Sequence, residues 1–313
     1  MNLQSATPTP LERQFAYVTG KGGVGKTTVT ASLAIAQASR GRRVLLATTE
    51  PEHYQVFWPG LVAETDPVAT PDGNLWLVAL EPTAAIQEFG RLRVRARVAR
   101  HALFGNRYAQ AFLSAVPGLP QWAVLGKAWY HSTEQLEGAP RFHTVIFDAP
   151  ATGHALQMLR IPQVIAEVAP AGLLRKDAES AGELLRDPAR CAVVVVTLPE
   201  TLPTNETEEL VAGLREGLHI EPAAIVANRV QPERFGAPTR AFLQGLDLGN
   251  QSPEDQALGL ALAVADREDL QARCLERLRR LGLPLIELPA VPNLTPSARC
   301  RRLAPLLTAA TPG

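Results

Sequence analysis

The residues best suited to chemistry lie in a glycine-rich stretch that reads TGKGGVGKTT over residues 19–28. Gly20, Gly25, Lys26 and Thr27 fill the pattern G-x-x-x-x-G-K-[ST]. Glycines let backbone N–H groups converge on phosphate oxygens, and a helix N-terminus adds positive potential. Lys26 can reach the β- and γ-phosphates, and the Thr27 hydroxyl can bind Mg²⁺. The stretch predicts an ATP site made by Gly20, Lys21, Gly22, Gly23, Val24, Gly25, Lys26, Thr27 and Thr28.

A second group of candidate residues follows an apolar run at residues 142–147 and begins with Asp148. An acidic residue at the end of an apolar strand is where a P-loop ATPase places its Mg²⁺-associated aspartate. Thr27 and Asp148 are therefore the expected metal-site residues. Gly153 follows closely, and its backbone N–H could contact the γ-phosphate as part of a switch loop.

Two other strand ends carry polar side chains. Glu50 follows the apolar run at residues 42–48, within the sequence TTEPEH. Asn228 ends the apolar run at residues 223–228, and its amide has the donor and acceptor that an adenine edge requires. We therefore expect Asn228 to contact the base.

The elements that must position these residues are short apolar runs separated by helical patterns. Such an alternation is typical of a doubly wound, mostly parallel α/β sheet with helices on both faces. Ligands of such sheets bind at the carboxyl ends of the strands. The expected strands cover residues 15–18, 42–48, 74–80, 142–147, 191–197, 223–228 and 284–288.

A helical insertion is expected between the two switch segments. Residues 82–137 read as mostly helical, and residues 154–189 read as helical with interruptions at Pro162 and Pro170. A further helix is expected to open at Thr204.

Two side-chain patterns in the insertion allow a structural or a functional interpretation. Trp122, Leu125 and Trp129 fall on one helical face, which could line a client groove but more commonly packs in the core. The basic run from Arg91 to Arg100 is typical of a solvated helix surface, although an acidic partner or lipid head group is the alternative.

Lys21 is a second lysine, placed directly after the first glycine of the loop. The resulting form GKGGVGKTT resembles the deviant P-loop of the ATPase class that contains the ParA/MinD proteins, the nitrogenase iron protein and the arsenite-pump ATPases. The resemblance implies that Lys21 reaches across a dimer to the partner's nucleotide and acts in catalysis. A solvated surface lysine is the alternative.

The resemblance narrows at the second group of residues. The sequence DAPATGHALQ at residues 148–157 resembles the switch DTAPTGHTLR of the ArsA and tail-anchored-protein-targeting ATPase family. The segments TLPE at 197–200, NET at 205–207 and ANR at 227–229 also resemble that family and occur in its order. The likeness runs from about Phe15 to Pro292. It implies a dimeric, Mg²⁺-dependent ATPase whose nucleotide state switches its conformation.

Glu50 departs from the family pattern S-T-D-P-A-H, in which the aspartate orients the attacking water. One added methylene can displace a carboxylate by an ångström, and a misplacement of that size can cost about 10²-fold in rate. Glu50 is therefore expected to be a slow water-orienting residue or a non-catalytic replacement. We expect the neighbouring Glu52 and His53 to be solvated.

Composition excludes several classes of function. With 46% hydrophobic residues the 313-residue chain can build a sizeable core. Lysine plus arginine equals aspartate plus glutamate at 31 each, so no net charge favours nucleic acid as a partner. No segment reaches the roughly 20 apolar residues of a membrane span, and residues 1–10 lack the apolar core of a signal peptide. These features predict a cytoplasmic location.

Cysteine usage points away from metal sensing. Cys191, Cys274 and Cys300 have no paired spacing, which fits a reducing compartment. The sequence has no C-x-x-C for zinc and no cysteine between residues 50 and 190 that could capture a soft metal. Neither zinc nor arsenite is expected to bind.

We expect residues 1–13 to form a flexible tail and residues 14–313 a single P-loop ATPase domain. The family resemblance implies a homodimer or a heterodimer with a homologous ATPase, and a protein client or membrane-associated partner that the sequence does not name. An ATP-binding regulatory subunit that barely hydrolyses ATP is the main alternative. A positioning ATPase of the ParA/MinD kind fits less well, because residues 308–313 are uncharged.

Overall fold

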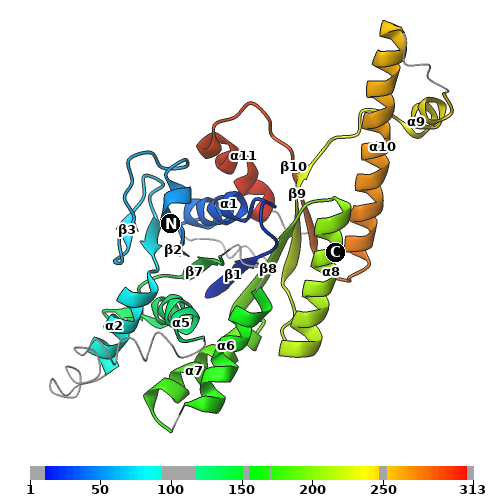
Figure 1. The fold of residues 1–313 in the computed structure, drawn as a ribbon. Coiled ribbons are helices and arrows are strands. Elements are labelled where there is room, and N and C mark those ends of the chain that lie inside the picture. The colour runs from blue at the N-terminus through cyan, green and yellow to red at the C-terminus, as the bar shows by residue number, and fades with distance from the viewer. Residues whose placement is uncertain (1–10, 94–117, 151–154, 170, 247–251, 309–313) are drawn as a thin grey trace.

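The computed structural model describes residues 11–93, 118–150, 155–169, 171–246 and 252–308. An eight-stranded sheet lies at the centre of this part of the chain, with helices around it (Figure 1). None of the helices in these ranges combines the length and apolarity that crossing a bilayer would require.

The sheet has the order β10-β9-β8-β1-β7-β2-β4-β3, and its strands are parallel except for β3, which runs antiparallel to β4. This confirms the doubly wound, mostly parallel α/β fold that the alternation of apolar runs predicted. The strands are β1 Phe15–Thr19, β2 Val44–Thr48, β3 Val68–Ala69, β4 Leu75–Ala79, β7 Thr144–Asp148, β8 Cys191–Thr197, β9 Ala224–Val230 and β10 Leu285–Pro289. A small separate hairpin pairs β5 Gln135–Leu136 with β6 Ala139–Pro140.

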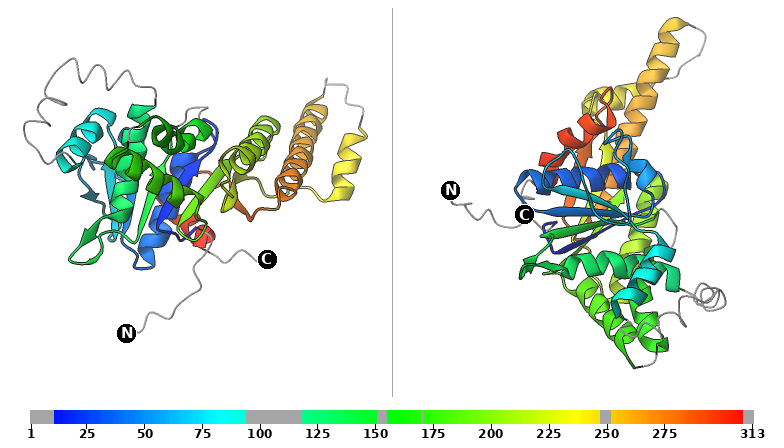
Figure 2. Two further views of the ribbon diagram at one scale, coloured as in Figure 1. Left: turned by 90° about the horizontal axis from the view of Figure 1, so that it is seen from below. Right: turned by 90° about the vertical axis from the view of Figure 1, so that its left-hand side faces the viewer.

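The helices alternate with these strands along the chain. They are α1 Lys26–Ser39, α2 Pro82–Arg93, α5 Leu119–Thr133, α6 Ala155–Val168, α7 Leu173–Arg186, α8 Thr201–Ala212, α9 Ala237–Gln244, α10 Pro253–Arg279 and α11 Pro296–Thr308, with the short turns η1 Pro51–Tyr54 and η2 Gly213–Gly217. The helix α9 and the N-terminal half of α10 extend beyond the edge of the sheet (Figure 2).

Two hydrophobic clusters cover the two faces of the sheet. Ala16 and Val18 of β1 pack in the cluster that contains α1 and α11. Phe15 and Tyr17 point to the opposite face, where α5, α6, α7 and α10 contribute side chains. Successive side chains of a strand point to opposite faces, so a strand covered on both sides must be apolar throughout. This explains the continuous apolar runs in the sequence.

Strand register brings the expected site residues to one edge. Asp148 at the end of β7 lies opposite Val18 of β1 and Thr48 of β2. The loop after β1, the turn after β2 and the last residue of β7 are therefore neighbours, although about 100 residues separate Thr48 from Asp148 in sequence.

Two helix predictions were wrong in detail. The helix α6 continues through Pro162 instead of stopping there. A proline inside a helix removes one hydrogen bond, but packing can compensate, and Pro162 faces Gly182 of α7, where there is no side chain to obstruct it. The helix α8 begins at Thr201, three residues before the predicted opening at Thr204. Pro170 lies outside the described residues.

The aromatic face of the insertion belongs to the core. Trp122 and Leu125 of α5 are buried, and Trp129 packs against the same clusters. This confirms the structural interpretation of that pattern. The side chains of the basic run from Arg91 to Arg100 lie outside the described part of the chain.

The described end of the expected tail, residues 1–13, packs against the helix α1. Leu11 is buried, and its carbonyl oxygen accepts a hydrogen bond from Gln37 Nε2 of α1. Glu12 pairs with Arg40 at the end of the same helix. Leu11 and Glu12 therefore belong to the packed structure, and residues 1–10 lie outside the described ranges.

Candidate functional site

The glycine-rich loop connects β1 to α1, as the motif requires, and two of its glycines are enforced by packing. Gly20 has a φ of +144°, and a Cβ there would stand 2.1 Å from the Val196 carbonyl oxygen of β8. Gly25 has a φ of +90°, and a Cβ there would stand 2.4 Å from Asn228 Nδ2 of β9. Both the left-handed backbone and the lack of space exclude a side chain at these positions.

The middle of the loop is open. Among the described residues, apart from the immediate chain neighbours, no atom lies within 4 Å of the point where a Cβ would be at Gly22 or Gly23. Lys26, the first residue of α1, is buried beneath this opening, and its Nζ donates to the Lys21 carbonyl oxygen at 3.1 Å. Burial lowers the pKa of Lys26, and the negative charges of Asp148 and Glu50 oppose that shift. A cationic amine next to the open backbone of a glycine-rich loop can bind phosphate oxygens.

Three hydroxyl groups surround the Asp148 carboxylate. Thr27 donates to Oδ2 at 3.1 Å, and the Tyr54 hydroxyl donates to the same oxygen at 2.8 Å. The Thr30 hydroxyl lies 3.2 Å from Oδ1. Burial raises the pKa of Asp148, while the hydrogen bonds from Tyr54 and Thr27 and the charge of Lys26 lower it. The carboxylate is thus held in place on both oxygens.

The donor set suits magnesium. Mg²⁺ prefers oxygen ligands and is commonly bound by one or two protein groups together with substrate phosphates and water. The Thr27 hydroxyl and the Asp148 carboxylate are such oxygens, 3.1 Å apart and next to the open loop. Within the described residues no cluster of three or more His, Cys, Asp or Glu side chains forms a dedicated protein metal site. The residues therefore fit a cation that arrives with a nucleotide.

Glu50 occupies the turn between β2 and η1, beside the same edge. Its side chain is 39% exposed, and its Oε2 lies 3.2 Å from Nδ1 of the exposed His53. Its backbone N–H donates to Thr48 Oγ1 at 3.1 Å. Glu52 is also exposed, in agreement with the expectation of a solvated segment.

The Lys21 side chain contacts the helix α8 in this structure. Its Nζ forms an ion pair with Glu206 Oε1 of α8, and the lysine side chain is 52% exposed. Glu206 belongs to the NET segment at residues 205–207 that carried part of the family resemblance. The sequence assigned no role to it, and only the fold brings it to Lys21.

Asn228 is buried at the end of β9 and supports the loop. Its Nδ2 donates to the Val24 carbonyl oxygen at 2.9 Å, and its Oδ1 accepts from the Arg229 backbone N–H. Arg229 adopts a φ of +58°. The side chain thus ties the second half of the loop to the sheet.

A pocket of about 250 Å³ adjoins Asn228 at the carboxyl ends of β9 and β10. It is lined by Thr28, Asn228, Arg229, Gln231, Pro289, Ala290, Val291, Pro292, Arg299 and Leu303. Thr28 follows Lys26 and Thr27, the residues predicted to contact the phosphates and Mg²⁺. The pocket therefore lies where a group attached to bound phosphates could extend.

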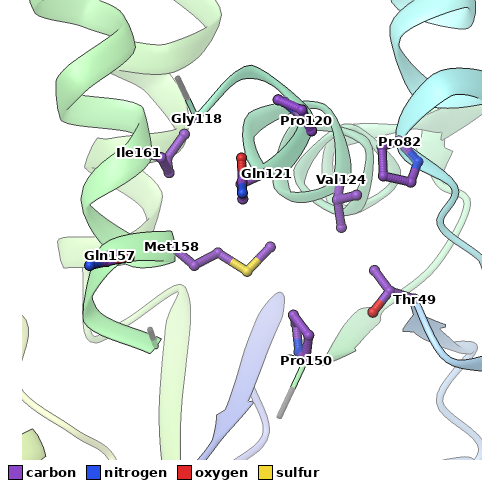
Figure 3. A pocket seen from close by; sticks show the side chains of 10 residues that line it. All are labelled: Thr49, Pro82, Gly118, Pro120, Gln121, Val124, Pro150, Gln157, Met158 and Ile161. Atoms are coloured by element: carbon purple, nitrogen blue, oxygen red, sulfur yellow. The ribbon is translucent and has the colours of Figure 1, made fainter. Parts of the chain in front are cut away.

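A second cavity of about 350 Å³ lies between the segments that follow β2 and β7 and the helices α5 and α6 (Figure 3). Thr49 lines it from the turn after β2 and Pro150 lines it from the segment after β7. Met158 of α6 and Gln121 of α5 face them across the cavity (Figure 3). Because a cavity lacks packing partners, the neighbours of Glu50 and Asp148 have room to move on this side.

Sequence reasoning singled out the loop, Asp148 and Asn228 as candidates, and the expected contact of Asn228 with the base stays a prediction. It missed three side chains that contact the loop or Asp148 in the structure. Tyr54 and Thr30 bond to Asp148, and Glu206 bonds to Lys21. Tyr54 lies four residues after Glu50, and this closeness was the available signal. Gly153 falls outside the described residues, so its expected contact with a phosphate stays a prediction.

Comparisons with known proteins agree with this geometry. A family model described as an anion-transporting ATPase, ArsA_ATPase, matches residues 13–171, which include the glycine-rich loop, Glu50 and Asp148. ATPase BagA of Mycobacterium tuberculosis is 27% identical over 296 residues, covering 88% of this chain and 86% of the relative.

Two eukaryotic relatives show the same likeness. ATPase GET3 of Lachancea thermotolerans is 31% identical over 178 residues, covering 54% of this chain and 49% of the relative. ATPase ARSA1 of Chlamydomonas reinhardtii is 26% identical over 346 residues, covering 91% of this chain and 42% of the relative. From the family match and the site it covers, the chain belongs to the ArsA ATPase family.

Proposed function

We propose that this chain is a Mg²⁺-dependent ATPase that works as a dimer and changes its binding of a partner with its nucleotide state. The observation that carries this proposal is the position of Lys26, Thr27 and Asp148 at one edge of the sheet, beside an open glycine loop. The family model that matches residues 13–171 is described as an ATPase, and relatives at 27% and 31% identity are named ATPases.

Each residue has a defined task in this proposal. The loop amides and the Lys26 amine hold the triphosphate, and the Thr27 hydroxyl and Asp148 carboxylate hold Mg²⁺. When bound, Mg²⁺ neutralises charge that develops on the phosphate oxygens. Asn228 and the adjoining pocket of about 250 Å³ receive the adenosine. Asn228 also keeps the loop in place through its bond to the Val24 carbonyl.

Glu50 orients the attacking water in this proposal, and the reaction is slow. Its half-exposed side chain has the room to turn from His53 toward the phosphate. Phosphoryl transfer depends on positioning and charge stabilisation, so a carboxylate with one extra methylene aims water less well in a loop suited to aspartate.

Lys21 acts on the partner's nucleotide in the dimer, which forms with a second copy or with a homologous ATPase. Lys21 stands at the surface, where it can exchange Glu206 for another anion. The cavity gives the segments next to Glu50 and Asp148 room to move toward α5 and α6, near which a client would bind. A cytoplasmic location fits this role.

The nucleotide assignment is tested by Lys26→Ala, with Lys176→Ala as the matched control. Lys176 is an exposed lysine on α7, away from the loop. Lys26→Ala removes the buried cation facing the phosphates and should abolish Mg·ATP binding in calorimetry. Lys176→Ala should bind like the wild type. Undiminished affinity in Lys26→Ala would remove the proposed site.

Turnover separates the ATPase from the alternative regulatory subunit. The ATPase hydrolyses ATP by itself, with a rate that rises with protein concentration as dimers form. A regulatory subunit would bind Mg·ATP and turn it over only when a homologous ATPase is added.

A further inference from the structure

Tyr54 connects Asp148 to the turn that carries Glu50. Its side chain is 1% exposed, and its hydroxyl donates to Asp148 Oδ2 at 2.8 Å. Tyr54 is the last residue of η1, and Glu50 is the residue that directly precedes this turn. One rigid turn therefore carries Glu50 at its start and a donor to Asp148 at its end.

The other side of the Tyr54 ring is anchored in an aromatic cluster. The ring stacks on Trp58 with centroids 6.0 Å apart and an interplanar angle of 9°, and it packs against Phe57 at 5.8 Å. Trp58 Nε1 donates to Asp72, whose carboxylate also pairs with Arg301 of α11. The hydroxyl is thus presented to Asp148 from a packed support, in a fixed direction.

The hydroxyls of Tyr54 and Thr27 converge on the same oxygen of Asp148. The Thr27 hydroxyl is the proposed ligand of Mg²⁺. A hydroxyl has lone pairs for a cation and one proton for a carboxylate, so Thr27 can keep its bond to Oδ2 with the cation bound. Tyr54 is the second donor that keeps Oδ2 in place. Thr30 holds the other oxygen from α1.

We propose that Tyr54 is a positioning residue that couples Mg²⁺ binding near Asp148 to the placement of Glu50. This inference rests on the proposed function, because it needs bound Mg·ATP. With Mg²⁺ held by Thr27 and Asp148, a displacement of Asp148 Oδ2 would pass through the Tyr54 hydrogen bond to η1 and so to Glu50, the carboxylate that orients water. Tyr54 itself touches neither the nucleotide nor the reacting atoms.

Tyr54 does not act as an acid or base in this role. Burial raises its pKa well above the usual value, and the charge of Asp148 raises it further. The phenol therefore stays protonated and remains a donor throughout the pH range in which the protein functions.

The test compares Tyr54→Phe with Tyr17→Phe. Tyr17 is also fully buried, its ring packs on Phe147 next to Asp148, and its hydroxyl has no hydrogen-bond partner within the described residues. Each substitution removes one buried hydroxyl and keeps the ring. Only Tyr54→Phe breaks a bond to the metal-site carboxylate.

Binding and turnover give separate readouts. Calorimetry with a non-hydrolysable ATP analogue should show that Tyr54→Phe needs about tenfold more Mg²⁺ for half-maximal binding, the effect of losing one hydrogen bond to a charged group. Its kcat should fall by about tenfold or more because Glu50 is misplaced, while KM for ATP at saturating Mg²⁺ changes by less than about twofold. Tyr17→Phe should match the wild type in all three measurements.

Trp58 supplies a measurement that leaves Tyr54 intact. Tryptophan emission of the wild type should change when Mg²⁺ is added to the protein with the ATP analogue, and Trp58→Phe should remove that change and thereby assign it. If Tyr54→Phe does not fold, the tryptophan emission of the wild type is the test. Trp58 emission that does not change when Mg²⁺ is added overturns the coupling.

The outcomes distinguish the two proposals. A wild type that binds no Mg·ATP overturns the proposed function and the coupling together. A wild type that binds and hydrolyses ATP, with a Tyr54→Phe variant that equals it in Mg²⁺ dependence and kcat, overturns the coupling alone.

Discussion

The candidate site has a buried half around Asp148 and an exposed half formed by Lys21 and Glu50. The protein holds the buried half more firmly than the exposed half. Asp148 is 5% exposed and receives hydroxyl groups from α1 and η1, so its position depends on the packed core. Lys21 and Glu50 are half exposed, and each is paired with one nearby side chain at the surface. Surface ion pairs contribute about 0–1 kcal/mol, whereas hydrogen bonds to buried charged groups contribute about 1.5–3 kcal/mol.

In the proposed function, this difference separates the groups that bind from the groups that switch. Groups that bind phosphate and metal are useful when they are already in place, because no ordering cost is then paid on binding. Groups that respond to a nucleotide or a partner must be able to leave their resting contacts. The ion pair of Lys21 with Glu206 and the contact of Glu50 with His53 are weak enough to be exchanged.

The largest effect is expected from Asp148→Asn, which breaks the buried half. The amide keeps the size of the side chain but removes the charge near the proposed metal, so turnover at saturating Mg·ATP should fall by about 100-fold or more. Asp66→Asn, at an exposed position, is the control and should keep full turnover. Comparable rates in the two variants would show that Asp148 has no part in the reaction.

The same variant gives a pH test of the nucleotide-free protein. Burial raises the pKa of Asp148, so ionisation of this carboxyl penalises the folded state. The associated stability is present below the unfolded pKa and is lost as pH rises through the folded pKa. The melting temperature of the wild type should therefore fall relative to that of Asp148→Asn as pH rises from about 4. A wild-type melting temperature that rises relative to that of the variant would contradict the shift.

A smaller effect is expected at Glu50, in the exposed half. Because the surrounding Thr49 and Pro51 match the family pattern, the loop suits aspartate, and Glu50→Asp should accelerate single-turnover hydrolysis. Glu50→Gln should slow it by about tenfold or more, because the amide is a poor acceptor for the water proton. Glu52→Gln, two residues along the same exposed turn, should leave the rate unchanged. A Glu50→Gln variant as fast as the wild type would show that this residue orients nothing.

The smallest effect on the isolated chain is expected at the pair of Lys21 with Glu206. Glu206→Gln and Lys21→Ala should each change the free energy of unfolding by less than about 1 kcal/mol, as for other exposed ion pairs. The two variants should differ once nucleotide is added. Lys21→Ala should bind Mg·ATP but fail to dimerise or turn over, whereas Glu206→Gln frees the lysine and should strengthen dimerisation.

Light scattering with and without Mg·ATP measures this difference, and Lys176→Ala is the matched control. A wild type that stays monomeric in every nucleotide state, with turnover unchanged in Lys21→Ala, would show that Lys21 does not act on a partner's nucleotide. It would also place this lysine among ordinary surface residues.

Much of the site could be predicted because its signals are local. The glycine pattern at residues 20–27 specifies a left-handed backbone and a helix start within a few residues. Asp148 closes an apolar run that reads as a buried strand, and parallel strands bring their carboxyl ends to one edge. Pro162 misled the prediction because a local helix breaker was outweighed by packing against Gly182 of a neighbouring helix.

The contacts between distant segments could not be predicted in the same way. The bond from Tyr54 to Asp148 joins residues 94 positions apart, and the bond from Asn228 to Val24 joins residues 204 positions apart. A sequence pattern records which side chains follow one another. It does not record the direction in which a phenol or an amide points once its element is packed.

The sequence by itself determined the glycine-rich loop, the alternation of the main parallel strands with helices, the position of Lys26 at a helix start, and the positions of Asp148 and Glu50 at or just after strand ends. These follow from backbone conformations and hydrophobic periodicity, which act over a few residues. Only the tertiary structure decided that Tyr54 donates to Asp148 and that Lys21 rests on Glu206. Such contacts depend on the register of the sheet and the packing of side chains on it, which are set by the whole chain together.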